Sequence, residues 1–185
     1  MIKRLFVEHR DASQAQALLR DISSNLKIAS LEGLRVLQRY DVEGIEGADF
    51  ESLKYTVFCE APVEVLYEES FPLSGGETAF GVEYLPGQFD QRADSARQCA
   101  QIVVRKLPEI ACAKIYVLKG ALSEDEVSRV KSYLINSVDS REASLEKPDT
   151  LSREAARPAD VAPISGFISM GDGELRDLHS SLGLA

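Results

Sequence analysis

The sequence predicts an α+β fold made of two similar halves, each with the order βαβαβ. Strand-like apolar runs alternate with segments in which apolar residues recur at helical spacing, and this order occurs twice. Gly44 and Gly120 fall at matching points of the two halves, about 76 residues apart, each after a strand and before a short helix. We therefore expect a duplicated unit that forms a pseudo-twofold dimer on one chain, with halves at about 1–72 and 78–147.

The first half begins with an apolar strand, and each later element follows from a change of periodicity. The helix from about Ala12 to Leu26 has one apolar face, and the short helix after Gly44 carries apolar side chains at similar spacing. The three predicted strands of this half are Ile2 to Glu8, Leu34 to Val42, and the extended segment from Val63 to Phe71.

The second half repeats this order from Ala79. Its first helix is predicted from the Asp90 cap to Leu107, and its second helix ends at Leu134. Ser123 and Glu126 have the spacing of a capping box, which places the start of the second helix. The predicted strands are Ala79 to Leu85, Ala113 to Lys119, and an extended tail through Leu145.

Each half alone would have a small hydrophobic core, so we expect the halves to cover one another. Two arrangements achieve this: two sheets that face each other, or two sheets joined edge to edge. The periodicity of the chain is compatible with both.

The domain organisation changes after Lys147. Residues 1–147 are predicted to form one domain, and residues 148–173, which are rich in proline and charge, an extended linker. Residues 174–185 are predicted to begin a helix that leads to a further linker domain, so we expect the natural chain to continue. The alternative is a short C-terminal helix that docks on its own domain.

Composition excludes several classes of function. The 185 residues carry a net charge of -9, from 21 basic and 30 acidic residues, and no basic cluster offsets it. A nucleic-acid partner is therefore not expected. No apolar run is long enough to span a membrane, so we expect a cytoplasmic protein. The three cysteines are predicted to be buried, reduced thiols, because free cysteine usually packs as a small hydrophobe.

The turn from Pro86 to Ser95 is the most informative segment. It lies between a predicted strand and a predicted helix, and Pro86-Gly87 breaks the strand while Asp90 caps the helix. Its polar side chains would meet a ligand or a neighbouring domain at the start of the helix. They are Gln88, Asp90, Gln91, Arg92 and Asp94.

Three segments resemble the N-terminal domain of large, single-chain phosphoribosylformylglycinamidine synthase. They are Arg39 to Gly44, Val82 to Ala96, and Ser140 to Pro148. The middle segment is specific and the other two support it, and the similarity runs over essentially the whole chain. In organisms with a split enzyme, the counterpart is a dimer of a small subunit, PurS, so the resemblance implies a PurS-like, ferredoxin-like pair of units.

The resemblance also implies a function. The family makes formylglycinamidine ribonucleotide from formylglycinamide ribonucleotide, glutamine and ATP in purine biosynthesis. Its parent chain continues with a linker, an ATP-binding synthetase region and a glutaminase. ATP and magnesium would belong to the parent enzyme and no cofactor to these residues, which lack the synthetase and glutaminase motifs and are expected to catalyse nothing alone.

On this resemblance, Gln88, Asp90, Gln91, Arg92 and Asp94 are candidate interface residues toward the synthetase, linker and glutaminase regions. Arg141 and Glu142 are the next candidates for the same docking surface. Two alternatives for Arg92 are an internal salt bridge and direct contact with a phosphate group. Apolar area exposed without the other regions would favour self-association of the isolated chain.

A different class of function remains open. Paired ferredoxin-like units also serve as free-standing regulatory modules, and such a module would place a small-molecule pocket at the junction of the two halves.

Overall fold

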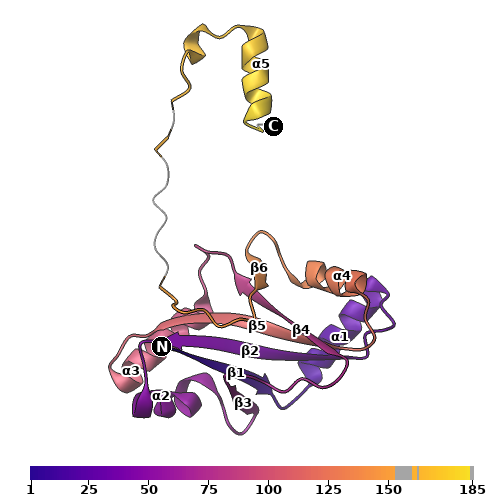
Figure 1. Cartoon of the computed structure of the whole chain (residues 1–185), viewed down its shortest axis with the longest axis vertical. Helices are drawn as coiled ribbons and strands as arrows, with labels where there is room; N and C mark the ends of the chain where they lie inside the picture. The colour runs from indigo at the N-terminus through magenta and orange to yellow at the C-terminus, as the bar shows by residue number, and fades with distance from the viewer. Residues whose placement is uncertain (153–159, 162, 184–185) are drawn as a thin grey trace. The chain divides into compact units, whose positions relative to one another are not determined.

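Six strands form one antiparallel sheet in the order β3-β1-β2-β5-β4-β6 (Figure 1). The computed structural model describes residues 1–152, 160–161 and 163–183. The strands are β1 (Ile2–His9), β2 (Gly33–Glu43), β3 (Glu64–Glu68), β4 (Glu77–Tyr84), β5 (Glu109–Lys119) and β6 (Ser140–Ala143). The described residues form five α-helices: α1 (Ser13–Leu26), α2 (Gly47–Leu53), α3 (Gln91–Val104), α4 (Glu124–Leu134) and α5 (Asp172–Ser181). The predicted α+β class is confirmed.

The two halves meet edge to edge. Every residue of β2 pairs with a residue of β5, from Gly33 opposite Lys119 to Glu43 opposite Glu109. β1 and β3 extend the sheet beyond β2, and β4 and β6 extend it beyond β5. Of the two arrangements that the sequence allowed, the chain forms the single continuous sheet.

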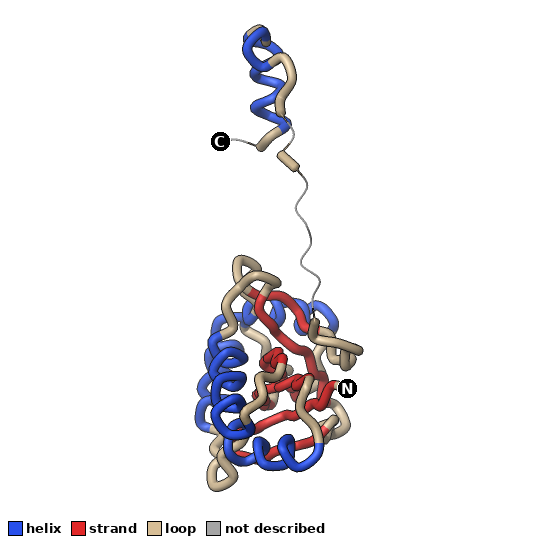
Figure 2. Tube along the Cα trace, turned by 90° about the vertical axis from the view of Figure 1, so that its left-hand side faces the viewer, coloured by secondary structure: helices blue, strands red, loops and turns tan. Residues whose placement is uncertain are grey.

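Four helices lie along one face of this sheet, here called the helix face (Figure 2). α1 and α4 lie together at one end, and α2 and α3 at the other (Figure 1). α2 continues into a π-helical turn, η1 (Lys54–Phe58). Each helix pair covers its own cluster of buried side chains. The largest fully buried members are Leu5, Val42, Ile45 and Leu53 under α2 and α3, and Ile22, Ile28, Phe80, Leu118 and Val130 under α1 and α4.

The opposite face of the sheet has a third apolar cluster, centred on Leu37, Ile115 and Val117. Phe71, from the loop after β3, packs on Phe6 with ring centroids 4.8 Å apart. Successive residues of a strand point to opposite faces, so β2 and β5 contribute to this cluster and to those of the helix face. Both central strands are therefore buried on two sides.

A buried ionic network lies beside this third cluster. Arg4 donates from Nε and Nη2 to the two carboxylate oxygens of Asp41, at 2.5 and 2.9 Å. Arg39 Nε lies 3.3 Å from the same carboxylate, and all three residues are at most 4% exposed. The arginines also donate to the carbonyls of Ser144 and Leu145, each at 2.6 Å. The chain after β6 is thus held against β1 and β2 by buried cations.

Both predicted helix caps are present. The Asp90 carboxylate accepts a hydrogen bond from the amide of Ala93 at 3.0 Å, and Ser123 and Glu126 form a capping box. The predicted end of the first of these helices at Leu107 is wrong. α3 ends at Val104 because Arg105 takes a left-handed conformation, with φ of 60°.

The sequence divides into two compact units, Met1–Arg153 and Glu154–Ala185. The second unit contains a short 3-10 helix, Phe167–Ser169, and α5, which begins two residues before the predicted start of the last helix. The amide of Gly171 donates to Glu174 at the start of α5. Part of the predicted linker, residues 153–159 and 162, lies outside the described residues, as do residues 184–185 of the predicted last helix.

None of the helices in the described part of the chain has the length and apolar character needed to cross a membrane. The longest, α1 and α3, have 14 residues each, whereas a span needs about 20.

We expect Asp41→Asn to lower the free energy of unfolding by about 3–5 kcal/mol, because it leaves the buried guanidinium of Arg4 without a counter-charge and leaves Arg39 with Glu83 alone, at 3.6 Å. Urea denaturation of both proteins measures the difference. The control is Asp149→Asn, at an exposed position, which should change stability by less than about 0.5 kcal/mol. A small effect of Asp41→Asn would contradict a central role for the network.

We also expect Gly120→Ala to destabilise the fold more than Gly44→Ala. Both glycines have positive φ, 141° and 92°, which costs a residue with a side chain about 1–2 kcal/mol. At Gly120, however, a Cβ atom would lie 1.9 Å from the carbonyl oxygen of Ser30, whereas at Gly44 the nearest atom is 4.0 Å away. Thermal unfolding of the two variants would show the difference, and equal melting temperatures would contradict it.

Candidate functional site

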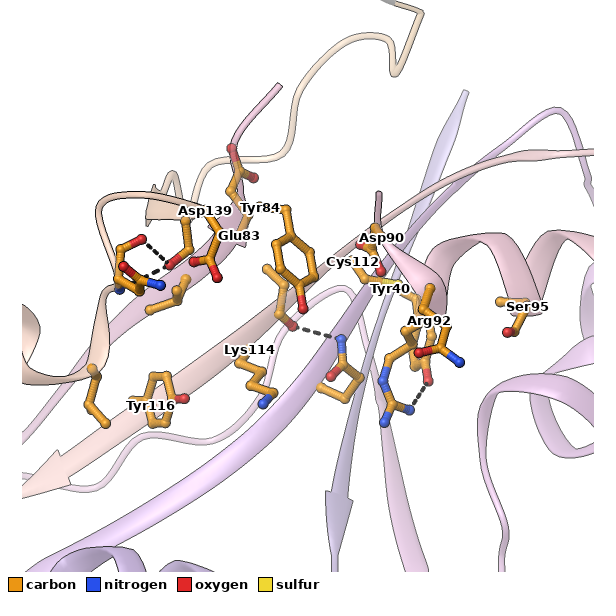
Figure 3. A pocket seen from close by; sticks show the side chains of 18 of the residues that line it. Tyr40, Glu83, Tyr84, Asp90, Arg92, Ser95, Cys112, Lys114, Tyr116 and Asp139 are labelled. Atoms are coloured by element: carbon orange, nitrogen blue, oxygen red, sulfur yellow. Dashed lines mark hydrogen bonds between the residues drawn. The ribbon is translucent and has the colours of Figure 1, made fainter. Parts of the chain in front are cut away.

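A groove of about 750 Å³ lies on the helix face, between α3 and the loop that joins α4 to β6. Its floor is formed by β2, β5 and β4, with Tyr40, Lys114 and Tyr84 among the floor residues (Figure 3). Arg92, Ser95 and Cys99 of α3 line one side, and Asn136 and Asp139 line the other. We call this hollow the central groove. It separates the apolar cluster under α2 and α3 from that under α1 and α4.

The turn before α3 determines which side chains reach the groove. Gly87, with φ of 92°, reverses the chain after β4, and the Asp90 cap sets the first turn of α3. Arg92 then donates from Nη1 to the hydroxyl of Tyr40 at 3.0 Å. Burial raises the pKa of Tyr40, and the hydrogen bond to Tyr40 raises the pKa of Arg92. The tyrosine therefore stays neutral and the guanidinium stays charged.

Lys114 lies on the floor of the groove, in the middle of β5. It pairs across the sheet with Gln38, whose side-chain amide donates to the carbonyls of Ala113 and Arg39. The Lys114 side chain is exposed and has no ion-pair or hydrogen-bond partner among the described residues. Its neighbours on the same face of β5, Cys112 and Tyr116, are buried. A charged side chain thus interrupts an otherwise buried row.

The structure brings together three of the five candidate residues in the turn. Asp90, Gln91 and Arg92 line the central groove, although the carboxylate of Asp90 is occupied by its capping bond. Gln88 is exposed and lines a smaller hollow next to the groove. Asp94 accepts a hydrogen bond from Gln98 at 2.7 Å, one turn further along α3.

Arg141 and Glu142 lie apart from this set. They are adjacent in β6, so their side chains point to opposite faces of the sheet. Arg141 pairs with Glu83 at 2.7 Å, and Glu142 pairs with Lys131 at 2.7 Å. Arg141 and Glu142 therefore form internal salt bridges. For Arg92 such a salt bridge was one of the alternatives, but its partner in the structure is the hydroxyl of Tyr40.

The three segments that carry the family resemblance touch one another. Tyr40 of the first segment bonds to Arg92 of the second. Arg39 of the first donates to the carbonyl of Ser144 in the third. Glu83 of the second pairs with Arg141 of the third. Segments that are far apart in the sequence therefore form one connected region of the fold.

Sequence reasoning missed Lys114, Tyr116, Asn136 and Asp139, which line the groove. One signal was available for Lys114. It lies on the face of a central strand where its neighbours at i−2 and i+2 are apolar or aromatic, so an apolar residue is expected there. A lysine at such a position indicates a functional or solvent-exposed site. The lining residues after α4 offer no such signal, because their position depends on the path of the loop.

The prediction of three buried thiols is wrong for one cysteine. Cys59 and Cys112 are buried, but Cys99 is exposed and lines the groove. Burial raises the pKa values of Cys59 and Cys112. Among the described residues, no group of three or more His, Cys, Asp or Glu side chains is arranged to hold a metal ion.

Comparison with known proteins adds no assignment: the chain matches no family model and no curated protein sequence.

We expect Cys99 to be the thiol that reacts in the native protein, because the other two are buried and their thiolates are disfavoured. Iodoacetamide followed by peptide mass spectrometry should find about one modified cysteine per chain under native conditions. All three should react in guanidinium chloride. Equal native labelling of Cys112 would contradict the burial described here.

Proposed function

We propose that this chain is the PurS-like N-terminal domain of a phosphoribosylformylglycinamidine synthase, acting in the cytoplasm. In this role it is a non-catalytic scaffold that bridges the synthetase and glutaminase regions of its parent protein. The observation that carries the proposal is the correspondence between the two halves of the sheet, which fits a pseudo-twofold dimer on one chain.

The register of the sheet supports this correspondence. The order β3-β1-β2 on one side becomes β6-β4-β5 on the other, so the halves follow the same path outward from the centre. Gln38 pairs with Lys114, and these residues are separated by the same number of positions as Gly44 and Gly120. A pseudo-twofold axis would therefore pass through the Gln38–Lys114 pair.

The turns before β3 and β6 support it further, because they share three hydrogen bonds at positions 76 residues apart and a fourth whose donors, Arg10 and Leu85, are 75 residues apart. In each turn, two backbone amides donate to the carbonyl of one residue, and the backbone amide of that residue donates to a side chain four positions later. A fourth amide, from the chain just before the first helix of the same half, donates to a carbonyl of the turn. The groups are Val63, Glu64, Glu60 and Arg10 in the first half, and Asp139, Ser140, Asn136 and Leu85 in the second.

A rigid bridge suits the chemistry of the proposed parent enzyme. Ammonia released by a glutaminase must reach the synthetase without being lost to water, which requires domains held in a fixed geometry. The buried network of Arg4, Arg39 and Asp41 and the continuous sheet supply such rigidity. On this proposal Gln88, Gln91 and Arg92 face another domain of the parent protein.

The proposal assigns both catalytic centres, ATP and magnesium to other regions of the parent protein.

A second candidate is a free-standing regulatory module that binds a small molecule. The specific observation in its favour is the central groove, which takes floor residues from both halves: Gln38 and Tyr40 from β2, and Lys114 and Tyr116 from β5. Its size is within the range of about 300–1,000 Å³ that is usual for ligand pockets.

Deletion of the coding segment for residues 1–147 from the native gene tests the first proposal. We expect growth to require added purines, because the remaining regions would lose the scaffold that connects them. The intact segment, restored at the same locus, should remove the requirement. Growth of the deletion strain without purines would reject the proposal.

The parent enzyme with Arg92→Ala provides a finer test. We expect its glutamine-dependent formation of formylglycinamidine ribonucleotide to fall more than its ammonia-dependent activity, because a loosened interface loses ammonia between the two centres. The matched control is Arg20→Ala, on α1, whose side chain is exposed and outside the groove. Equal loss of both activities would point to general instability and not to a domain contact.

A further inference from the structure

The central groove presents two cations that form no ion pair within the described part of the chain, although the charge of Glu64 acts on Arg92 from outside the groove. The ammonium of Lys114 has no polar partner there, and the guanidinium of Arg92 bonds only to the neutral hydroxyl of Tyr40. Both side chains are exposed to the same hollow, although the chain as a whole has a net charge of -9. Unpaired cations that share a concave site attract an anion.

The remaining lining favours an organic ligand over a simple ion. Tyr84, which is 48% exposed, gives the groove an aromatic surface on which a flat group can lie, whereas Tyr40 and Tyr116 are buried in the floor (Figure 3). Gln91 and Asn136 add amides that both donate and accept hydrogen bonds. Such a mixture of apolar floor and few polar groups is typical of small-molecule pockets.

Three acidic side chains line the groove and restrict where the anionic group would lie. Glu83 is paired with Arg141 at 2.7 Å and lies 3.6 Å from Arg39. Asp90 is occupied by the amide of Ala93, at the start of α3. Asp139 lies on the other side of the groove, beyond β4, on the loop that follows α4. The position between Lys114 and Arg92 therefore suits the negative group, and the side near Asp139 suits a hydroxyl or amino group.

We propose that the central groove binds a small organic anion whose carboxylate or phosphate lies between Lys114 and Arg92, with the rest of the molecule against the exposed ring of Tyr84. This inference rests on the second candidate function, the small-molecule role of the groove, and not on the scaffold role, which the deletion strain tests separately.

Cys99 gives a direct readout of occupancy, because it is exposed in the native protein and lines the groove. The rate of its alkylation by iodoacetamide, a neutral reagent, would be measured on the full chain with millimolar ribose 5-phosphate, inorganic phosphate or citrate. Ribose serves as the uncharged control. The melting temperature, measured with the same probes, gives a second readout that does not involve the thiol.

We expect at least one anion to slow the alkylation about fivefold or more, because a ligand in the groove covers the thiol of Cys99. The same anion should raise the melting temperature, because it binds only the folded state. Protection by ribose 5-phosphate or phosphate would identify a phosphate ligand, and protection by citrate alone a carboxylate. The double variant Lys114→Gln, Arg92→Gln should lose both effects. Lys119→Gln, on the same strand but outside the groove, should keep them.

Three results would overturn the inference. The first is that no anion changes the alkylation rate or the melting temperature of the wild-type protein. The second is that ribose changes them as much as the anions do. The third is that the double variant, with a native circular dichroism spectrum, responds to the anions as the wild type does. Protection by an acidic peptide and by none of the small anions would also overturn it, and would make the groove a surface for a protein partner.

Discussion

The antiparallel pairing of β2 with β5 is the interaction on which the rest of the structure depends. It runs the whole length of both strands and turns two three-stranded units into one six-stranded sheet. Because it places both strands in the interior, their side chains contribute to the apolar clusters on both faces. A half without its partner would have an exposed edge strand and a core too small for much stability.

The same pairing explains how a groove arises at the centre of a packed domain. Each pair of helices covers the outer part of one end of the sheet, and the polar pair Gln38 and Lys114 lies between the two covered regions. A lysine there cannot be buried without a counter-charge. The floor between the helix pairs is therefore open, and Arg92 and the tyrosines reach the opening from neighbouring elements.

The buried ionic network has a different role. Burying Arg4, Arg39 and Asp41 costs desolvation energy, and burial lowers the pKa of Arg39. Hydrogen bonds to the carbonyls of Ser144 and Leu145 offset part of this cost and attach the chain after β6 to the first half. Arg39 thus has a structural role in the buried network, whereas Arg92, in the segment from Val82 to Ala96, faces the groove.

Features that depend on near neighbours in the chain could be predicted from the sequence. Periodicity located each strand and helix of the first unit, and the caps at Asp90 and Ser123 were predicted because a cap bonds to an amide only three residues away. Three features could be read only from the folded chain: the halves join edge to edge, Arg141 pairs with Glu83, and Lys114 lines the same groove as Arg92. These contacts depend on strand order and register, and a shift of one residue in register would move every side chain of a strand to the other face.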